Sequence, residues 1–305
     1  MPITIEQLRY VALGTRDLEA AGRFAADELG LRAVQDSADE IAFRSDERQY
    51  SVVYARDDAR RQAIGLEVRD EAALQSAADA LQARGIALVR EAALAARRNV
   101  RALGAFTTPG GLRVELVVRP QNQAWRFFPQ RDAGITGLAA VALRSTDVAA
   151  DEALWIEVFG MRVGDWVGDA AYLGFDAAHH RLSLHPSARA GVLAVEFGVE
   201  GINQVMQQFH RLRPVPEAIV HGPGRRPVSE QVFLTFSGPD EVLYAFVAEG
   251  RQVDPSAPPR PRQFGGGPES HCAWGSACRV PELDGRTAAP LAPSARPALR
   301  GVLRG

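Results

Sequence analysis

The side chains best suited to chemistry in this chain are a histidine pair, one carboxylate and two arginines in its second half. His180 is the second residue of the pair in "AAHHRLSLHP", and Glu196 follows it in the apolar run "GVLAVEFGV". Imidazole and carboxylate groups transfer protons, while guanidinium groups bind carboxylates and developing oxyanions. Together with Arg144 and Arg226, these residues predict acid/base chemistry or anion binding, provided that the fold brings them together.

These segments belong to the second of two similar halves of the chain. The motif "LGTRD" at 13–17 returns as "LRSTD" at 143–147, and Pro109 returns as Pro239. Several anchors in the same order at nearly constant spacing indicate a duplicated module. We expect a first module at 1–120, a linker at 121–134, a second module at 135–250 and a tail at 251–305. The substrate site should be the concave face, or cup, of the second module.

Each half has the pattern of a strand, a helix, several strands, a second helix and a closing strand. Asp17 and Asp147 stand where helix N-caps belong, before Ala- and Leu-rich stretches at 18–29 and 148–159. Gly residues follow these stretches, as is typical of helix ends. This order predicts an α+β fold in which curved mixed sheets carry helices on their outer faces.

Two motif regions resemble a known superfamily. The stretch "GPGRRPVSEQVFLTFSGPDEVLYAF" at 222–246 and the strand region at 177–186 are similar to the vicinal oxygen chelate superfamily, which includes glyoxalases and bleomycin resistance proteins. The resemblance is closest to its two-module type I extradiol catechol dioxygenases and covers roughly residues 5–248. It implies tandem modules of paired βαβββ units, a small aromatic substrate and a homo-oligomer.

In that family a ferrous or manganous ion is held in the second module by two His and one Glu, a triad that leaves open positions for substrate and dioxygen. The three ligand positions fall on Ala140, Ala194 and Ala245 in this sequence. Alanine has no lone pair to donate, so we expect no metal here and no other cofactor. The equivalent positions of the first module are Tyr10, Ala63 and Glu115. These three residues also make a poor iron site.

The resemblance also indicates what surrounds the lost triad. An acid/base His of the family falls on Arg226, whereas His180 is retained beside the expected substrate. Strand alternation places Glu196 on the same face as Ala194, and Arg144 on the same face as Ala140. We therefore expect catalytic roles for His180, Glu196 and Arg226, with Arg144 and the three alanines binding the substrate. Replacing three ligands with alanine should also enlarge the pocket for a planar aromatic compound.

Each of these residues also has a simpler interpretation. His180 can be a strand residue with one structural hydrogen bond. Glu196 and Arg144 can form a structural ion pair inside the barrel, and Arg226 can lie in a solvated loop beside Pro227. The sequence alone leaves these alternatives open.

Composition limits the class of protein. The chain has 305 residues, 46% hydrophobic content and a formal net charge of −2, which favours a globular protein without a nucleic-acid-binding surface. There is no apolar run long enough for a membrane span, and the N-terminus lacks signal-peptide features, so we expect a cytoplasmic protein. All its basic side chains other than histidine are arginine, which excludes a Schiff-base lysine.

The tail at 251–305 differs from the rest, with nine of the nineteen Pro residues and eight Arg against four acidic residues. This composition predicts a largely disordered segment. It contains both cysteines, Cys272 and Cys278, close to His271 and Trp274. Three ligands in one short run fall short of a zinc site. The alternatives are two reduced thiols, or a segment anchored by Trp274 that folds back as a lid or clasps a neighbouring subunit.

Three functions follow as hypotheses. The first is a metal-independent enzyme, of lyase, isomerase or hydrolase type, that acts on a phenolic or ring-cleaved aromatic compound by acid/base chemistry. The second is a non-catalytic protein that binds or sequesters an aromatic ligand. The third is a true extradiol ring-cleavage dioxygenase with metal ligands that the sequence comparison does not identify. Fold membership alone does not choose among them.

Overall fold

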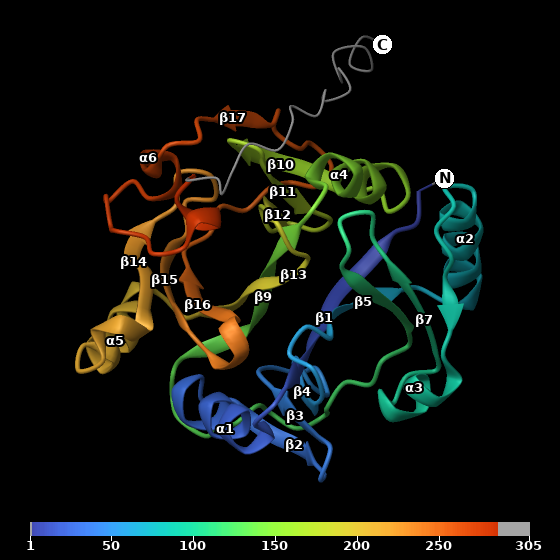
Figure 1. The fold of residues 1–305 in the computed structure, drawn as a ribbon, viewed down its shortest axis with the longest axis horizontal. Helices are drawn as coiled ribbons and strands as arrows, with labels where there is room; N and C mark the ends of the chain where they lie inside the picture. The colour runs from blue at the N-terminus through green and yellow to red at the C-terminus, as the bar shows by residue number, and fades with distance from the viewer. Residues whose placement is uncertain (1, 286–305) are drawn as a thin grey trace.

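The computed structural model describes residues 2–285 and consists of two curved mixed β-sheets that lie side by side, with helices around them (Figure 1). The first sheet has the strand order β2-β3-β4-β1-β5-β8-β7-β6, and the second has β14-β15-β16-β13-β9-β12-β11-β10-β17. The predicted α+β fold of two tandem modules is confirmed.

The first sheet contains β1 (Ile5–Thr15), β2 (Arg32–Asp36), β3 (Glu40–Arg44), β4 (Val52–Arg56), β5 (Gln62–Val68), β6 (Val89–Arg90), β7 (Ala102–Thr107) and β8 (Arg113–Val118). Its helices are α1 (Leu18–Arg23), α2 (Glu71–Gln82) and α3 (Ala92–Arg97), and α1 continues into a π-helical turn, η1 (Phe24–Glu28).

The second sheet contains β9 (Ile135–Ser145), β10 (Arg162–Val167), β11 (Ala170–Gly174), β12 (Leu182–Pro186), β13 (Gly191–Val199), β14 (Ile219–Arg225), β15 (Val232–Ser237), β16 (Leu243–Ala248) and β17 (Arg262–Phe264). Its α-helices are α4 (Val148–Glu157), α5 (Ile202–Leu212) and α6 (Pro268–His271), with short 3₁₀ turns η2 (Pro216–Ala218), η3 (Pro239–Glu241) and η4 (Pro281–Leu283).

The duplication is visible in the topology. If β9–β16 are taken as counterparts of β1–β8, both sheets have the same strand order, apart from the additional strand β17 beside β10. Pro109 lies in the turn between β7 and β8, and Pro239 lies in the equivalent turn between β15 and β16. A single duplicated unit accounts for both sheets.

The predicted helix boundaries follow their local signals. The side chain of Asp17 accepts a hydrogen bond from the backbone N–H of Ala20, and that of Asp147 accepts one from Ala150. These are N-caps, which satisfy N–H groups that have no partner inside the helix. Gly160, just after α4, has a φ of 61°, the left-handed conformation that ends many helices.

Apolar residues from both modules form the main core. In β9, Leu138, Val141 and Leu143 belong to this core, whereas Ala142 packs with Ala194 in a separate cluster. The strand thus has one face in the main core and another that lines the concave side of the second sheet. That concave side is the cup in which the candidate residues were expected.

The tail differs from the expectation of disorder over the part that the structure describes, residues 251–285. β17 pairs with β10 at one edge of the second sheet, while the N–H groups of Ala273 and Arg279 donate to carbonyls of β14 at the other edge. The tail therefore runs from edge to edge across the mouth of the cup, as the red ribbon from β17 to β14 shows in Figure 1. Residues 286–305 lie outside the described part.

Among residues 2–285, none of the helices is both long enough and apolar enough to cross a membrane.

Candidate functional site

A buried ion pair occupies the position where the family triad was expected. Glu196, on β13, lies in register with Ala140 on β9 and Ala245 on β16. The two terminal nitrogens of Arg226 donate to the two carboxylate oxygens of Glu196 over 2.9 and 2.8 Å. The side chains of Glu196 and Arg226 are 3% and 11% exposed. Burial lowers the pKa of Arg226, but the charge of Glu196 outweighs this effect and raises it overall.

The residues at the triad positions do not fit a metal. Ala140, Ala194 and Ala245 are all buried, and they offer no donor atom. Over the described residues, no three His, Cys, Asp or Glu side chains lie close enough together to hold an ion. The small side chains of Ala140 and Ala245 on either side of Glu196 instead leave room for the Glu196–Arg226 pair.

His180 lies in the loop before β12, and its ring faces this pair. Its Nε2 atom is 4.0 Å from a carboxylate oxygen of Glu196 and has no hydrogen-bond partner, although the side chain is only 1% exposed. The ring makes an edge contact with Tyr172, with centroids 5.0 Å apart. Burial lowers the pKa of His180 well below its ordinary value, and the nearby cations add to this effect. A buried, neutral imidazole with a free nitrogen beside a carboxylate can act as a base.

Two cavities adjoin these residues. The smaller has a volume of about 20 Å³, and its lining includes Glu196, Arg226, Tyr172 and Ala142. It has room for roughly one water molecule. The predicted enlarged aromatic pocket is therefore wrong for this conformation, because the ion pair and the tail residues His271 and Leu283 fill the cup.

The larger cavity, about 240 Å³, is bordered by His180. Its other lining residues include Thr136, Ala139, His179, Arg181, Ser229, Gln231 and Arg251. Since His180 also contacts Glu196 and Tyr172 of the smaller cavity, it stands at the boundary between the two.

Three further histidines, for which the sequence predicts no role in the cup, also face the smaller cavity: His185, His221 and His271. Burial lowers the pKa of His185 to about 3 and that of His221 to about 4, and it also lowers the pKa of His271. Alternation along β12, where Ser183 and His185 share a face, is the signal that could have identified His185. No local signal identifies His271, because it enters the site from the tail.

Arg144 does not lie with Glu196 in the way that was expected. Its guanidinium contacts Glu282 over 3.0 Å and donates to the carbonyl of Val192 over 3.0 Å. Arg144 stands at the end of β9, where η4 of the tail crosses the cup, so the tail provides the nearer carboxylate. Its predicted role in substrate binding is replaced here by a contact that holds the tail.

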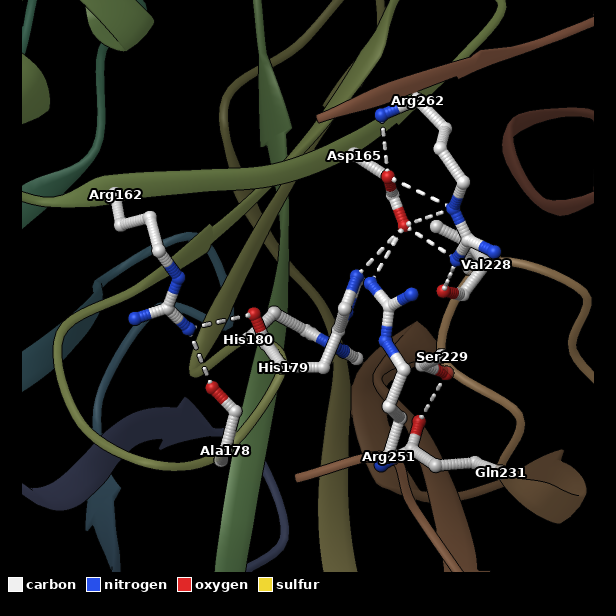
Figure 2. A network of polar contacts seen from close by, with 10 residues as sticks. All are labelled: Arg162, Asp165, Ala178, His179, His180, Val228, Ser229, Gln231, Arg251 and Arg262. Carbon is white, nitrogen blue, oxygen red and sulfur yellow. Dashed lines mark hydrogen bonds and ion pairs between the residues drawn. The ribbon is translucent and has the colours of Figure 1, made fainter. Parts of the chain in front are cut away.

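The tail is also held by Asp165 on β10. This carboxylate accepts hydrogen bonds from His179 Nε2 at 2.9 Å and from the backbone N–H and guanidinium of Arg262 in β17 (Figure 2). Arg251 donates to the same carboxylate over 3.1 Å. Burial raises the pKa of Asp165, but the hydrogen bonds from His179 and Arg262 prevail and lower it to about 2. Trp274, which the lid hypothesis made the anchor of the tail, is 49% exposed, whereas Cys272 is buried.

Asp165 should therefore make stability depend on pH in acid. Its folded-state pKa of about 2 lies below the value of 3.8 that is usual for an aspartate in an unfolded chain, so its contribution of about 2 kcal/mol is complete above about pH 4. That contribution is lost as the pH falls through about 2. Chemical denaturation of the natural protein and Asp165→Asn should show a difference in unfolding free energy that shrinks below pH 4. A difference that stays constant from pH 7 to pH 3 would contradict the network.

The equivalent positions of the first module are occupied by a structural network. Tyr10 donates to Glu115 over 2.6 Å, and Arg98 lies 3.5 Å from the same carboxylate. With Ala63 at the third position, this cluster also lacks an iron triad. Residues at metal-ligand positions should lie close together in space. The contact between Tyr10 and Glu115 therefore supports their alignment with the ligand positions of the second module.

Comparison with known proteins gives the family. No family model matches the sequence. The chain is 33% identical over 201 residues to biphenyl-2,3-diol 1,2-dioxygenase of Paraburkholderia xenovorans (strain LB400), covering 63% of this chain and 67% of that protein. It is 28% identical over 199 residues to the enzyme of the same name from Pseudomonas sp. (strain KKS102), covering 60% and 68%.

Solved structures agree on the fold. A Mn(II)-bound glyoxalase from Novosphingobium aromaticivorans superposes with a TM-score of 0.82 at 23% identity, covering 97% of both chains. BphC, a halotolerant catechol dioxygenase, superposes with a TM-score of 0.81 at 21% identity, covering 92% of this chain and 97% of that one. The chain belongs to the extradiol dioxygenase family within the vicinal oxygen chelate superfamily.

Proposed function

We propose that this protein is an enzyme that acts on a small phenolic or ring-cleaved aromatic compound by acid/base chemistry without an iron triad. His180 is the base, and its Nε2 atom takes a proton from the substrate. The observation that carries the proposal is that this buried nitrogen has no hydrogen-bond partner and lies 4.0 Å from a carboxylate, in a residue that borders a cavity of about 240 Å³.

The Glu196–Arg226 pair supports this role electrostatically. Once His180 is protonated, the carboxylate of Glu196 lies close enough to stabilise the imidazolium. Arg226 holds the carboxylate of Glu196 in place by two hydrogen bonds. Arg226 does not have to bind the substrate in this arrangement, since Glu196 already occupies both of its terminal nitrogens.

The substrate class is supported by the relatives and by the size of the cavity. Relatives named as acting on biphenyl-2,3-diol and 1,2-dihydroxynaphthalene are aromatic diol dioxygenases. The volume of about 240 Å³ suits a compound with a single ring, and Arg181 and Arg251 border it. An acidic phenol or a ring-cleaved carboxylate would provide the acidic proton that the base removes. Its negative charge would be attracted by these two arginines.

The test is turnover in the presence of a chelator. Catechol, biphenyl-2,3-diol and their ring-cleaved acids would be incubated anaerobically and aerobically with EDTA-treated protein, and products would be identified by mass spectrometry. We expect a product whose formation needs neither added metal nor oxygen. Binding of a compound without any conversion would instead support a non-catalytic, ligand-binding protein.

The second candidate function is extradiol ring cleavage, and on relationship alone it is the better supported activity, because the curated relatives are dioxygenases. The donor set argues against it, since the three triad positions are alanine. Oxygen-dependent formation of a ring-cleaved product that Fe(II) restores after chelation would establish this second function in place of the first.

A further inference from the structure

A continuous hydrogen-bonded chain connects Asp165 to the candidate base. The Oδ2 atom of Asp165 lies 2.9 Å from His179 Nε2, and His179 Nδ1 lies 3.1 Å from His180 Nδ1. The three side chains are between 0% and 2% exposed, so water does not compete for these contacts. Figure 2 shows His179 between Asp165 and His180, with the guanidinium of Arg251 beside the His179 ring and Arg262 on the other side of the carboxylate.

The positions of the protons follow from this chain. Asp165 is ionised, because its pKa is about 2, and so it only accepts hydrogen bonds. His179 must therefore carry its proton on Nε2. Burial lowers the pKa of His179, which keeps the ring neutral with a single N–H. Its Nδ1 atom is then an acceptor, and His180 must donate from its own Nδ1.

We propose that Asp165 and His179 are positioning residues that hold His180 in the Nδ1–H tautomer, with the lone pair of Nε2 directed toward Glu196. The geometry around Nε2 agrees with this assignment. Its separation of 4.0 Å from the Glu196 oxygen suits two acceptors rather than a donor and an acceptor. A protonated Nε2 would be a buried donor without a partner.

The charged and titratable groups around His180 are compatible with a neutral ring. Glu196 favours a proton on Nε2, but the bidentate contact with Arg226 offsets part of this effect. Arg181, His185 and Tyr172 also lie near the ring; the positive charge of Arg181 opposes protonation of the ring. The Asp165–His179 contact is therefore the interaction that selects one tautomer.

This arrangement has a consequence for catalysis, which rests on the function proposed above. When the substrate loses a proton, its O–H or C–H bond breaks and an N–H bond forms at His180 Nε2. The proton on His180 Nδ1 can then pass to Nδ1 of His179. The positive charge is thereby shared with a ring that already donates to a carboxylate, as in other His–carboxylate pairs.

The tautomer can be read without any substrate, so this inference and the proposed function can fail separately. The full chain has six histidines, and ¹⁵N-histidine labelling with long-range ¹H–¹⁵N correlation reports which nitrogen of each ring carries the proton. His180→Gln assigns the His180 signals, and His210, which is exposed on α5, provides an internal reference.

We expect His180 to have a protonated Nδ1 and a bare Nε2 in the natural protein. His179→Ala should move the proton to Nε2, the usual position in free histidine. His179→Asn should preserve the Nδ1–H tautomer, because the amide oxygen can accept in place of the ring nitrogen. A protonated Nε2 in the natural protein would overturn the proposal, and so would an unchanged tautomer in folded His179→Ala. If His179→Ala does not fold, the spectrum of the natural protein decides.

Discussion

Replacing Glu196 with alanine should lower the free energy of unfolding by about 3–5 kcal/mol, because it leaves the Arg226 guanidinium charged and unpaired in a buried site. Both terminal nitrogens of Arg226 lose their carboxylate partners, while the contacts with Gln231 and the face of the Phe233 ring remain. Chemical denaturation of the two proteins at pH 7 measures the difference.

Two control variants separate the cause from simple truncation. The double variant Glu196→Leu/Arg226→Met removes both charges and should recover most of the lost stability. Glu241→Ala breaks an exposed ion pair, in which the side chain of Arg189 is 52% exposed and that of Glu241 is 74% exposed. This change should lower the free energy of unfolding by less than about 1 kcal/mol. If Glu196→Ala changed stability no more than Glu241→Ala, the buried pair would not exist as described.

Replacing His180 with alanine should reduce turnover by about 10²–10⁴-fold, the usual contribution of a general base. The pKa of His180 lies well below its ordinary value, so the base should stay neutral and active as the pH falls below 6.5. The measurement is kcat/KM against pH for the natural protein and for His180→Ala, with the melting temperature followed in parallel.

His210→Ala, an exposed change on α5, is the control and should keep full activity. Turnover by His180→Ala within threefold of the natural protein would exclude His180 as the base. It would direct attention to His185, His221 and His271 around the smaller cavity.

Most of the fold could be predicted from the sequence because the duplication leaves local marks. The N-caps at Asp17 and Asp147 are short-range features that lie where the pattern placed them, and the repeated Pro109 and Pro239 lie in equivalent turns. The inward direction of Glu196 also follows from a short-range rule, the alternation of side chains along a strand.

The site was predicted less well because its remaining parts depend on long-range contacts. The partner of Arg144 is Glu282, far away in a segment whose composition suggests disorder. The tail is ordered instead by specific contacts that composition does not reveal, such as Arg262 with Asp165. His179 was overlooked because alternation cannot place two consecutive loop residues, and its importance depends on Asp165.

Long-range contacts also explain why the cup is filled by protein side chains. Alanine at positions 140, 194 and 245 is smaller than the two His and one Glu of the family, so the sequence predicts an empty space there. Close packing in protein interiors, however, allows few voids. Arg226 and the tail enter the space that those alanines leave. The volume available to a ligand is therefore found beside His180 rather than at the triad positions.

Metal binding tests the central claim most directly. The purified protein would be treated with EDTA, reconstituted anaerobically with Fe(II) or Mn(II), desalted and measured by inductively coupled plasma mass spectrometry, with a metal-dependent extradiol dioxygenase treated alongside. We predict less than about 0.1 metal ion per chain for this protein, since alanine at the three triad positions offers no donor. One tightly bound ion per chain, together with ring cleavage that depends on it, would contradict the account.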